Sequence, residues 1–278
     1  MNKLSELINL AYQDAKNFRD KLNLDNYCAG QLLKIIDRLQ ITENVCIKLI
    51  RTPFKNIDLS GFIGYKKGAF IIVTNTNHKL GSERFTIAHE IYHLLSNRTK
   101  IKEESIIEEL EKCSDDEDIQ EIMANAFAAE LLMPEEILSE DVNILTKGKN
   151  NIDESIIVEL QQKYGVSYVA MTKRLNEIGL ITKEHCNSFE IFEEKSDELE
   201  ELTKNLGYTN ELNIPSRSTY LGQNDLQNIR VNYKNGDIDY DDLVRIFSYL
   251  GCEPEKFGYY RKQDISDDAL EFMKALSE

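Results

Sequence analysis

The chain has 278 residues, of which 41% are hydrophobic and 29% are charged. This length suits two or three packed units, because domains commonly contain about 100 to 150 residues. The formal net charge of −16 argues against a strong bulk attraction to nucleic acid or anionic lipid, which depends on clustered Lys and Arg. No apolar run approaches the roughly 20 residues that span a bilayer, so we expect no membrane segment.

The five cysteines are odd in number and widely spaced. Such spacing favours neither a disulfide framework nor a thiolate metal site. The N-terminal residues place apolar side chains at helical intervals among charges, unlike the continuous apolar centre of a secretion signal. We therefore expect a cytoplasmic protein.

The first part of the chain predicts two helices followed by a small sheet. Residues 2–20 and 29–40 space apolar side chains at helical intervals. Three short β-branched and aromatic runs follow, "VCIKLI", "GFIGYK" and "AFIIVTN", and the "KKG" between the last two suits a tight hairpin. Gly81 and Ser82 are then expected to cap a helix over residues 83–97.

The rest of the chain predicts mainly helices. Residues 101–121 are strongly acidic, which indicates a solvated helix and loop. An alanine-rich helix follows and ends near Pro134. Residues 153–180 have a helix-turn-helix outline with a turn at Gly165. Residues 184–220 are polar and indicate a linker with a short helix, and two more helices follow.

One stretch, "RFTIAHEIYHLL", contains two of the four histidines in the chain. On a helix, His89 and His93 project from the same face one turn apart, so both imidazoles can reach one ion. Glu90 lies beside that face, where it can contact a metal-bound water without being a ligand. Apolar residues on the opposite side predict a buried back: Ile87, Ile91, Leu94 and Leu95. The pattern is typical of zinc hydrolases.

A catalytic zinc site needs three protein ligands and one open position. The stretch "EIMANAFAAELLMP" offers Glu121 as the third ligand. Asn125 lies one turn further on the same helix face, where it can accept the second N–H of a ligating histidine. Alanines beside this face would allow the two helices to approach closely. His78 and His185 are alternative third ligands, although neither lies on a recognisable partner element.

The two stretches together resemble the ImmA/IrrE family of metallopeptidases. The family pattern is close to F-T-x-A-H-E-[LI]-x-H-x-L and then E-x-x-A-N-x-F-A-x-x-L-L-M-P, and both halves occur here in order. The resemblance covers about residues 40–180. It implies that His89, His93 and Glu121 bind Zn²⁺ and that Glu90 is the general base for peptide hydrolysis.

We therefore expect an α+β fold. A zincin-like metallopeptidase domain over residues 1–150 would combine a small β-sheet with the motif helix and the packed ligand helix. A helix-turn-helix-like segment at 151–190 and a helical region at 191–278 would follow. One departure from the family pattern is Tyr92, where glycine is more usual, and we expect this side chain to narrow the cleft beside the zinc face.

Three functions are compatible with these residues. The first is a cytoplasmic zinc endopeptidase, for which the resemblance implies a protein substrate, typically a helix-turn-helix repressor controlling a mobile element or a stress response. The second is a DNA-binding transcriptional regulator that acts through residues 153–180, with a structural or vestigial metal site. The third is a metal-dependent interaction module without turnover, against which the intact Glu90 argues.

For the endopeptidase, the strand just before the motif helix suggests how a substrate binds. Extended peptides often bind by adding a strand to the exposed edge of a sheet. We expect the strand at residues 69–74 to lie at an exposed edge that accepts the substrate in this way, and a central position for this strand would rule the idea out.

Overall fold

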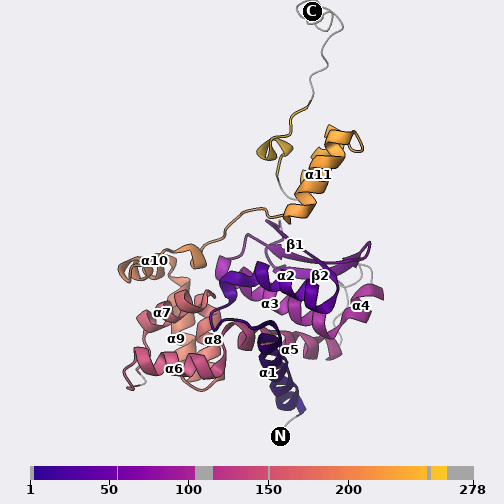
Figure 1. Cartoon of the computed structure of the whole chain (residues 1–278). Coiled ribbons are helices and arrows are strands. Elements are labelled where there is room, and N and C mark those ends of the chain that lie inside the picture. Colours follow the sequence, from indigo (N-terminus) through magenta and orange to yellow (C-terminus); the bar gives the residue numbers. More distant parts are fainter. Residues whose placement is uncertain (1–2, 55, 104–114, 150, 249–251, 262–278) are drawn as a thin grey trace, which may run out of the picture. The chain divides into compact units, whose positions relative to one another are not determined.

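The computed structural model (Figure 1) describes residues 3–54, 56–103, 115–149, 151–248 and 252–261. The chain divides into two compact units, Met1–Tyr220 and Leu221–Glu278. The division therefore falls after residue 220, whereas the sequence predicted boundaries after residues 150 and 190. One continuous hydrophobic core explains the larger first unit, because its buried side chains run from Ala11 to Leu199.

The first unit begins with helices close to the predicted ranges. They are α1 (Lys3–Leu22), the 3₁₀ helix η1 (Ala29–Gln31) and α2 (Leu32–Glu43). Helix α2 ends at Asn44, whose φ of 49° is left-handed. Asparagine tolerates this conformation better than most residues, so the chain can turn directly from α2 into the sheet.

The sheet contains three strands, as predicted: β1 (Cys46–Thr52), β2 (Gly61–Lys66) and β3 (Ala69–Asn75). Strands β2 and β3 form the predicted antiparallel hairpin. Lys67 and Gly68, between them, have φ values of 51° and 86°. Positive φ at both central residues is the geometry that hairpin turns favour, and it fixes the register that pairs Ile63 with Ile72.

The prediction that residues 69–74 lie at an exposed edge is wrong. The strand order is β1-β3-β2, and β1 pairs with β3 in parallel, so β3 is central. Its nearly continuous burial is typical of a central strand. On the outer side of β1, Arg51 forms an antiparallel bridge with Tyr220. Strand β2 is the edge strand at the other side of the sheet.

Four helices follow: α3 (Leu80–Ser96), α4 (Arg98–Glu103), α5 (Asp115–Leu132) and α6 (Glu135–Leu145). Helices α2 and α3 cover one face of the sheet, and α5 packs against both α3 and α1 (Figure 1). Much of the predicted acidic helix and loop, residues 104–114, lies outside the described residues.

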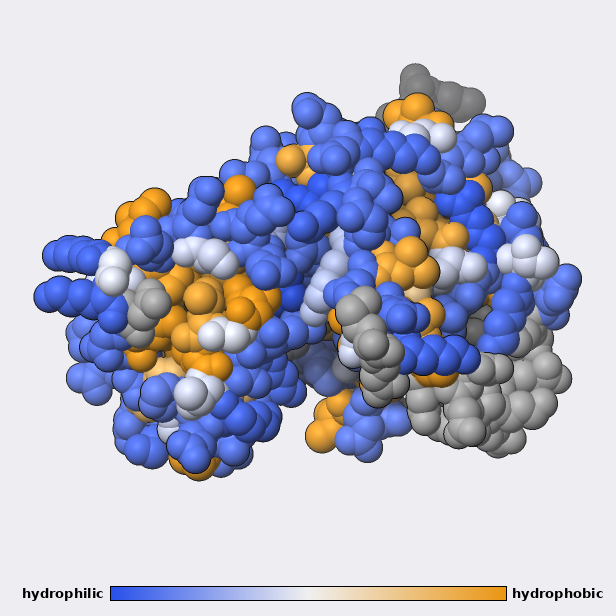
Figure 2. All heavy atoms as spheres, turned by 90° about the horizontal axis from the view of Figure 1, so that it is seen from below, coloured by the Kyte–Doolittle hydropathy of each residue, from blue (hydrophilic) through white to orange (hydrophobic). Residues whose placement is uncertain are grey.

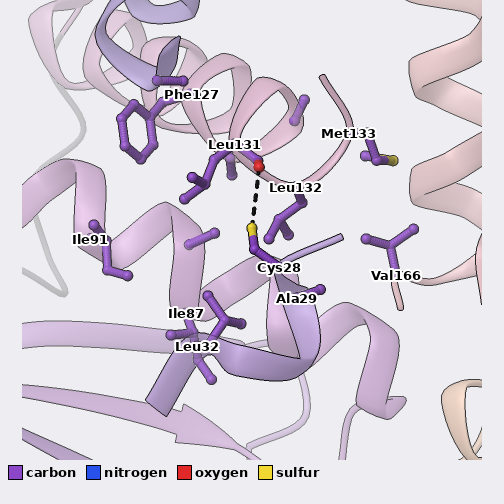
Figure 3. Close-up of a cluster of buried hydrophobic side chains, with 14 of the residues drawn as sticks. Cys28, Ala29, Leu32, Ile87, Ile91, Phe127, Leu131, Leu132, Met133 and Val166 are labelled. Atoms are coloured by element: carbon purple, nitrogen blue, oxygen red, sulfur yellow. Dashed lines mark hydrogen bonds between the residues drawn. The ribbon is translucent and has the colours of Figure 1, made fainter. Parts of the chain in front are cut away.

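Where these helices meet, their apolar side chains form a dense core (Figure 3). Ile87 and Ile91 of α3 face Phe127 and Leu131 of α5 within it, and all four are buried. The thiol of Cys28 donates a hydrogen bond to the carbonyl oxygen of Leu131 at 3.4 Å. This core fixes the spacing between α3 and α5, the two helices that carry the predicted site.

Helices α7 (Glu154–Tyr164) and α8 (Tyr168–Glu177) occupy the predicted helix-turn-helix positions. Gly165 makes the turn between them with a φ of 69°. Asp153 and Ser167 cap the two helices, because each side chain accepts a hydrogen bond from a first-turn backbone N–H.

The prediction that residues 184–220 form a linker with one short helix underestimates the helical structure. This part forms α9 (Lys183–Glu194), α10 (Ser196–Asn205) and the 3₁₀ helix η2 (Glu211–Asn213). Each long helix buries a narrow apolar stripe in a polar sequence, and the stripes include Cys186, Phe189 and Leu199. So few apolar positions give a weak sequence signal.

Residues 214–220, hereafter the strap, are hydrogen-bonded to α3 and β1 and end the first unit. The Leu80 N–H, at the start of α3, donates to the carbonyl oxygen of Ile214 at 3.1 Å. Arg51 of β1 exchanges two backbone hydrogen bonds with Tyr220, at 3.1 and 2.9 Å. The strap therefore joins the edge of β1 to the beginning of the motif helix.

The second unit contains α11 (Gln223–Asn235), α12 (Tyr240–Ser248) and the 3₁₀ helix η3 (Pro254–Phe257). Asp239 and Asp242 form a reciprocal cap at the start of α12, each accepting from the other's backbone N–H. Leu243 and Phe247 are buried on the inner face of this helix.

Hydrophilic residues cover most of the molecular face drawn in Figure 2, and apolar atoms are exposed only in limited areas. Among the described helices, none combines the length and the apolar composition that crossing a membrane requires.

Candidate metal centre

Helix α3 begins earlier than the sequence indicated, and the predicted cap is wrong. Its first residue is Leu80, and the preceding Lys79 makes no side-chain cap. Gly81 lies inside the helix, where a Cβ atom would stand 2.4 Å from the Ser167 backbone nitrogen and 2.5 Å from the Val166 carbonyl carbon. Glycine is needed here because the start of α3 touches the start of α8.

The buried back of α3 is confirmed. Ile87, Ile91 and Leu94 are at most 4% exposed, and Leu95 packs against the same core. The histidines are turned toward α5 instead, and their side chains remain 13% to 14% exposed. The amphipathic pattern thus directs the polar residues of α3 as predicted.

Helix α5 brings Glu121 to this polar face. Ala124 and Ala128 are completely buried on α5, which lies directly against α3. Such small side chains permit the close approach that was predicted. Glu121 extends from the first half of α5, and its side chain is 56% exposed. The site is therefore open on the Glu121 side and closed on the helix side.

Potential ligand atoms of three residues lie close together between the two helices. Glu121 Oε2 lies 3.0 Å from His89 Nε2, and Glu121 Oε1 lies 3.1 Å from His93 Nε2. The two histidine Nε2 atoms are 3.0 Å apart. Together the three residues form a group that can hold a metal ion.

Asn125 fixes which nitrogen of His89 carries the proton. His89 Nδ1 lies 3.0 Å from Asn125 Oδ1, a carbonyl oxygen that can only accept. Nδ1 therefore donates, so the neutral ring presents a lone pair at Nε2 toward Glu121. Two acceptors 3.0 Å apart repel each other unless a positive charge lies between them.

The pKa shifts of the cluster also indicate that a positive charge between these residues is favourable. Hydrogen bonds from His89 and His93 hold the pKa of Glu121 well below its usual range. Burial alone would lower the pKa of His89, but the hydrogen bond with Glu121 and the charges of Glu90 and Glu121 outweigh burial and raise it. A proton or a metal ion can supply this positive charge, and the two compete for the same lone pairs.

The separations between the histidine nitrogens and the Glu121 oxygens fit a small divalent ion. Zinc binds nitrogen and oxygen at about 2.0–2.2 Å, so the ligand atoms of a tetrahedral site lie roughly 3.3 Å apart. The observed separations of 3.0 to 3.1 Å are close to that value. Two imidazoles and one carboxylate form a ligand set that zinc enzymes use, with a fourth position left for solvent or substrate.

Glu90 lies next to the cluster but outside it. Its side chain is largely buried, with 6% of the residue exposed, and its negative charge contributes to the raised pKa of His89. The ligand group itself consists of His89, His93 and Glu121. Glu90 is therefore adjacent to the ligand group in sequence without belonging to it.

The alternative third ligands lie elsewhere. His78 Nε2 is 2.8 Å from the Ile57 carbonyl oxygen, and His185 is exposed on α9. Tyr92 does not narrow the cleft, contrary to the prediction. It is only 4% exposed and packs in the core against Phe127, with ring centroids 5.4 Å apart.

Helix α8 is poorly suited to reading DNA. Tyr168, Met171 and Leu175 are buried on it, and so is Arg174, which forms an ion pair with Glu130. A recognition helix must expose its side chains to a groove. Lys173 is the exposed basic residue on this helix, so the DNA-binding interpretation of residues 153–180 has little support.

One set of buried polar residues beside the site was missed from the sequence. Glu83 of α3 is 1% exposed and accepts hydrogen bonds from Arg51 of β1 at 2.7 and 2.7 Å. Thr74 of β3 donates a third at 2.8 Å. The one available signal was that Glu83 precedes Glu90 by seven residues, two helical turns, and so shares its face.

Comparison with known proteins agrees with this geometry. Residues 42–176 match the family model Peptidase_M78, described as the IrrE N-terminal-like domain. This range nearly equals the predicted span of 40–180 and contains the whole ligand group. No curated protein matches the chain. The part of the chain that carries the ligand group is therefore similar to the IrrE N-terminal-like domain of this peptidase family.

Proposed function

We propose that this chain is a zinc-dependent endopeptidase that hydrolyses a peptide bond in a protein substrate. The observation that carries the proposal is that the ligand atoms of three residues lie within 4.8 Å of one another, with Glu90 next in sequence to one of them. His89, His93 and Glu121 would hold the metal ion. Zinc, when bound, supplies a Lewis acid that polarises a carbonyl group and lowers the pKa of water to about 7.

The residues of the chain perform the proton transfers. Glu90 accepts a proton from water at its carboxylate and then donates it to the leaving nitrogen of the cleaved peptide. Asn125 holds the His89 ring by its Nδ1–H, which keeps Nε2 available as a ligand.

We further propose that the substrate adds to β2 as an extended strand. This strand replaces the edge at residues 69–74 that the strand order rules out. Gly61, at the start of β2, lies against Thr86 of α3. Strand β2 also contacts α4, the helix that follows α3. Strand β2 therefore runs beside the part of α3 that carries Glu90, where an added peptide would lie near the base.

The substrate class we propose, a helix-turn-helix repressor, is supported by the family resemblance. A cytoplasmic location suits such a substrate, and it suits the reduced thiols of Cys28, Cys46 and Cys186 in the described part of the chain.

The decisive experiment compares the wild type with Glu90→Gln, each loaded with zinc. Both are incubated with a library of quenched fluorescent peptides and with a small helix-turn-helix repressor from a neighbouring gene. We expect both proteins to bind zinc and the variant to cleave about 100- to 10,000-fold more slowly. Equal cleavage by both would exclude Glu90 as the base, and no cleavage by the zinc-loaded wild type would overturn the proposed function.

A further inference from the structure

The polar group formed by Glu83, Arg51 and Thr74 has no direct part in the proposed chemistry, yet it is unusually complete. The Glu83 side chain is fully buried and accepts two hydrogen bonds from Arg51 and one from Thr74. The Glu83 hydrogen bonds raise the pKa of Arg51, so this guanidinium stays charged. The group joins α3 to two different strands.

Stability alone is a poor explanation for such a group. Removing two charges from water costs free energy that their attraction often fails to recover, so apolar residues of similar size frequently stabilise a fold equally well. What a bidentate Arg–carboxylate pair adds is fixed geometry, because its two parallel hydrogen bonds define both distance and orientation.

The geometry fixed here is the position of Glu90, the proposed base, relative to the sheet. Glu83 and Glu90 are two turns apart and about 20° from each other around the axis of α3. Thr86 lies between them and contacts Gly61, where a Cβ atom would stand 2.6 Å from its methyl group. The face of α3 that carries Glu90 is thus held to the sheet at Glu83 and Thr86, whereas the histidines are held from α5.

We propose that Glu83 is a positioning residue, which sets the rotation and axial position of α3 so that Glu90 meets a peptide bound along β2. This inference rests on the proposed peptidase function. Because α5 supplies the contacts of the metal ligands, loss of Glu83 should disturb the base more than the metal. A displacement of the reacting groups by about 1 Å can cost roughly 100-fold in rate.

The chain offers a matched control for the loss of a buried carboxylate. Asp141 of α6 is 5% exposed and accepts hydrogen bonds from Tyr27, Lys163 and Tyr164. Like Glu83 it receives three side-chain hydrogen bonds, but Asp141 and all of its donors lie outside α3. Asp141→Asn should therefore destabilise the fold while leaving the geometry of Glu90 unchanged.

The experiment measures zinc affinity, kcat and KM for Glu83→Gln, Thr74→Val and Asp141→Asn, at a temperature where unfolding curves show each variant folded. The substrate is the quenched peptide that wild type cleaves fastest. For Glu83→Gln we expect kcat to fall about tenfold or more with KM and zinc affinity within about threefold of wild type. Thr74→Val removes one of the three donors, so its kcat should lie between those of wild type and Glu83→Gln. Asp141→Asn should keep the wild-type kcat.

The outcomes separate the two proposals. A wild-type kcat in folded Glu83→Gln, or an equal loss in Asp141→Asn, would overturn the positioning role and leave the peptidase intact. A parallel fall in zinc affinity would also overturn it, because Glu83 would then act on the ligands. Failure of the wild type itself to cleave any peptide would overturn both.

Discussion

His89 and Asn125 are joined by a hydrogen bond of 3.0 Å between Nδ1 and Oδ1, which links the motif helix to the ligand helix. This contact orients the imidazole and selects its tautomer. We expect Asn125→Ala to lower zinc affinity about 10- to 100-fold, the usual cost of losing such a partner. Competition with a fluorescent chelator measures the effect. Gln120→Ala, a change on the same helix, is the control, and an equal loss there would contradict the prediction.

Zinc should stabilise the folded chain through the three ligands. Binding to the native state alone contributes about 2.7 kcal/mol when free zinc is 100 times its Kd. We expect thermal unfolding of the metal-free wild type to shift upward on addition of zinc and that of Glu121→Gln to shift little. His185→Ala changes an exposed histidine outside the ligand group and should behave like wild type. If zinc shifted the unfolding of Glu121→Gln as much as that of wild type, Glu121 would not be a zinc ligand.

Gly81 should be intolerant of any side chain. The Cβ of alanine would overlap backbone atoms of Val166 and Ser167, which cannot rotate away, so α3 and α8 must separate. We expect Gly81→Ala to lower the free energy of unfolding by more than about 3 kcal/mol, in the range of severe core changes. Urea unfolding provides the measurement. Gly30→Ala meets no atom within 4 Å and should be nearly neutral. Similar midpoints for the two variants would show that the contact at Gly81 relaxes freely.

Glu43 should stabilise the fold above acid pH. Hydrogen bonds from Lys21 and Arg98 lower its pKa in the folded state. Its stabilisation is therefore present above the unfolded pKa of about 4.3 and disappears as the pH falls through the lower folded value. Glu43→Gln should lose about 0.2–1 kcal/mol at pH 7. In urea titrations the difference from wild type should shrink as the pH falls below the unfolded value of about 4.3, and a difference that grows toward acid pH would contradict this sign.

Local patterns in the sequence predicted that His89, His93 and Glu121 lie together. The four-residue spacing of His89 and His93, and of Glu121 and Asn125, is a property of single helices, so each pair could be placed on a face before any packing was known. The small residues of α5 then indicated which helices meet. Tyr92 could not be placed in this way, because its burial depends on where Phe127 lies.

The missed features depend on contacts between distant residues. Gly81 looked like a cap, but its role is set by a backbone 85 residues later. The strand order was not predicted, although the nearly continuous apolar run at the start of residues 69–75 is typical of a central strand. The pairing of Arg51 with Glu83 crosses from strand to helix, and neither residue has a local pattern that indicates burial. Helices α9 and α10 were missed because few apolar positions define them.

The strap has a mechanical consequence for the catalytic helix. Tyr220, its last residue, is bonded through its backbone to Arg51, whose side chain holds Glu83. The very next residue, Leu221, begins the second unit. Tension on the polypeptide at residue 220 would therefore reach β1 first and then, through the Arg51 guanidinium, the helix that bears Glu90.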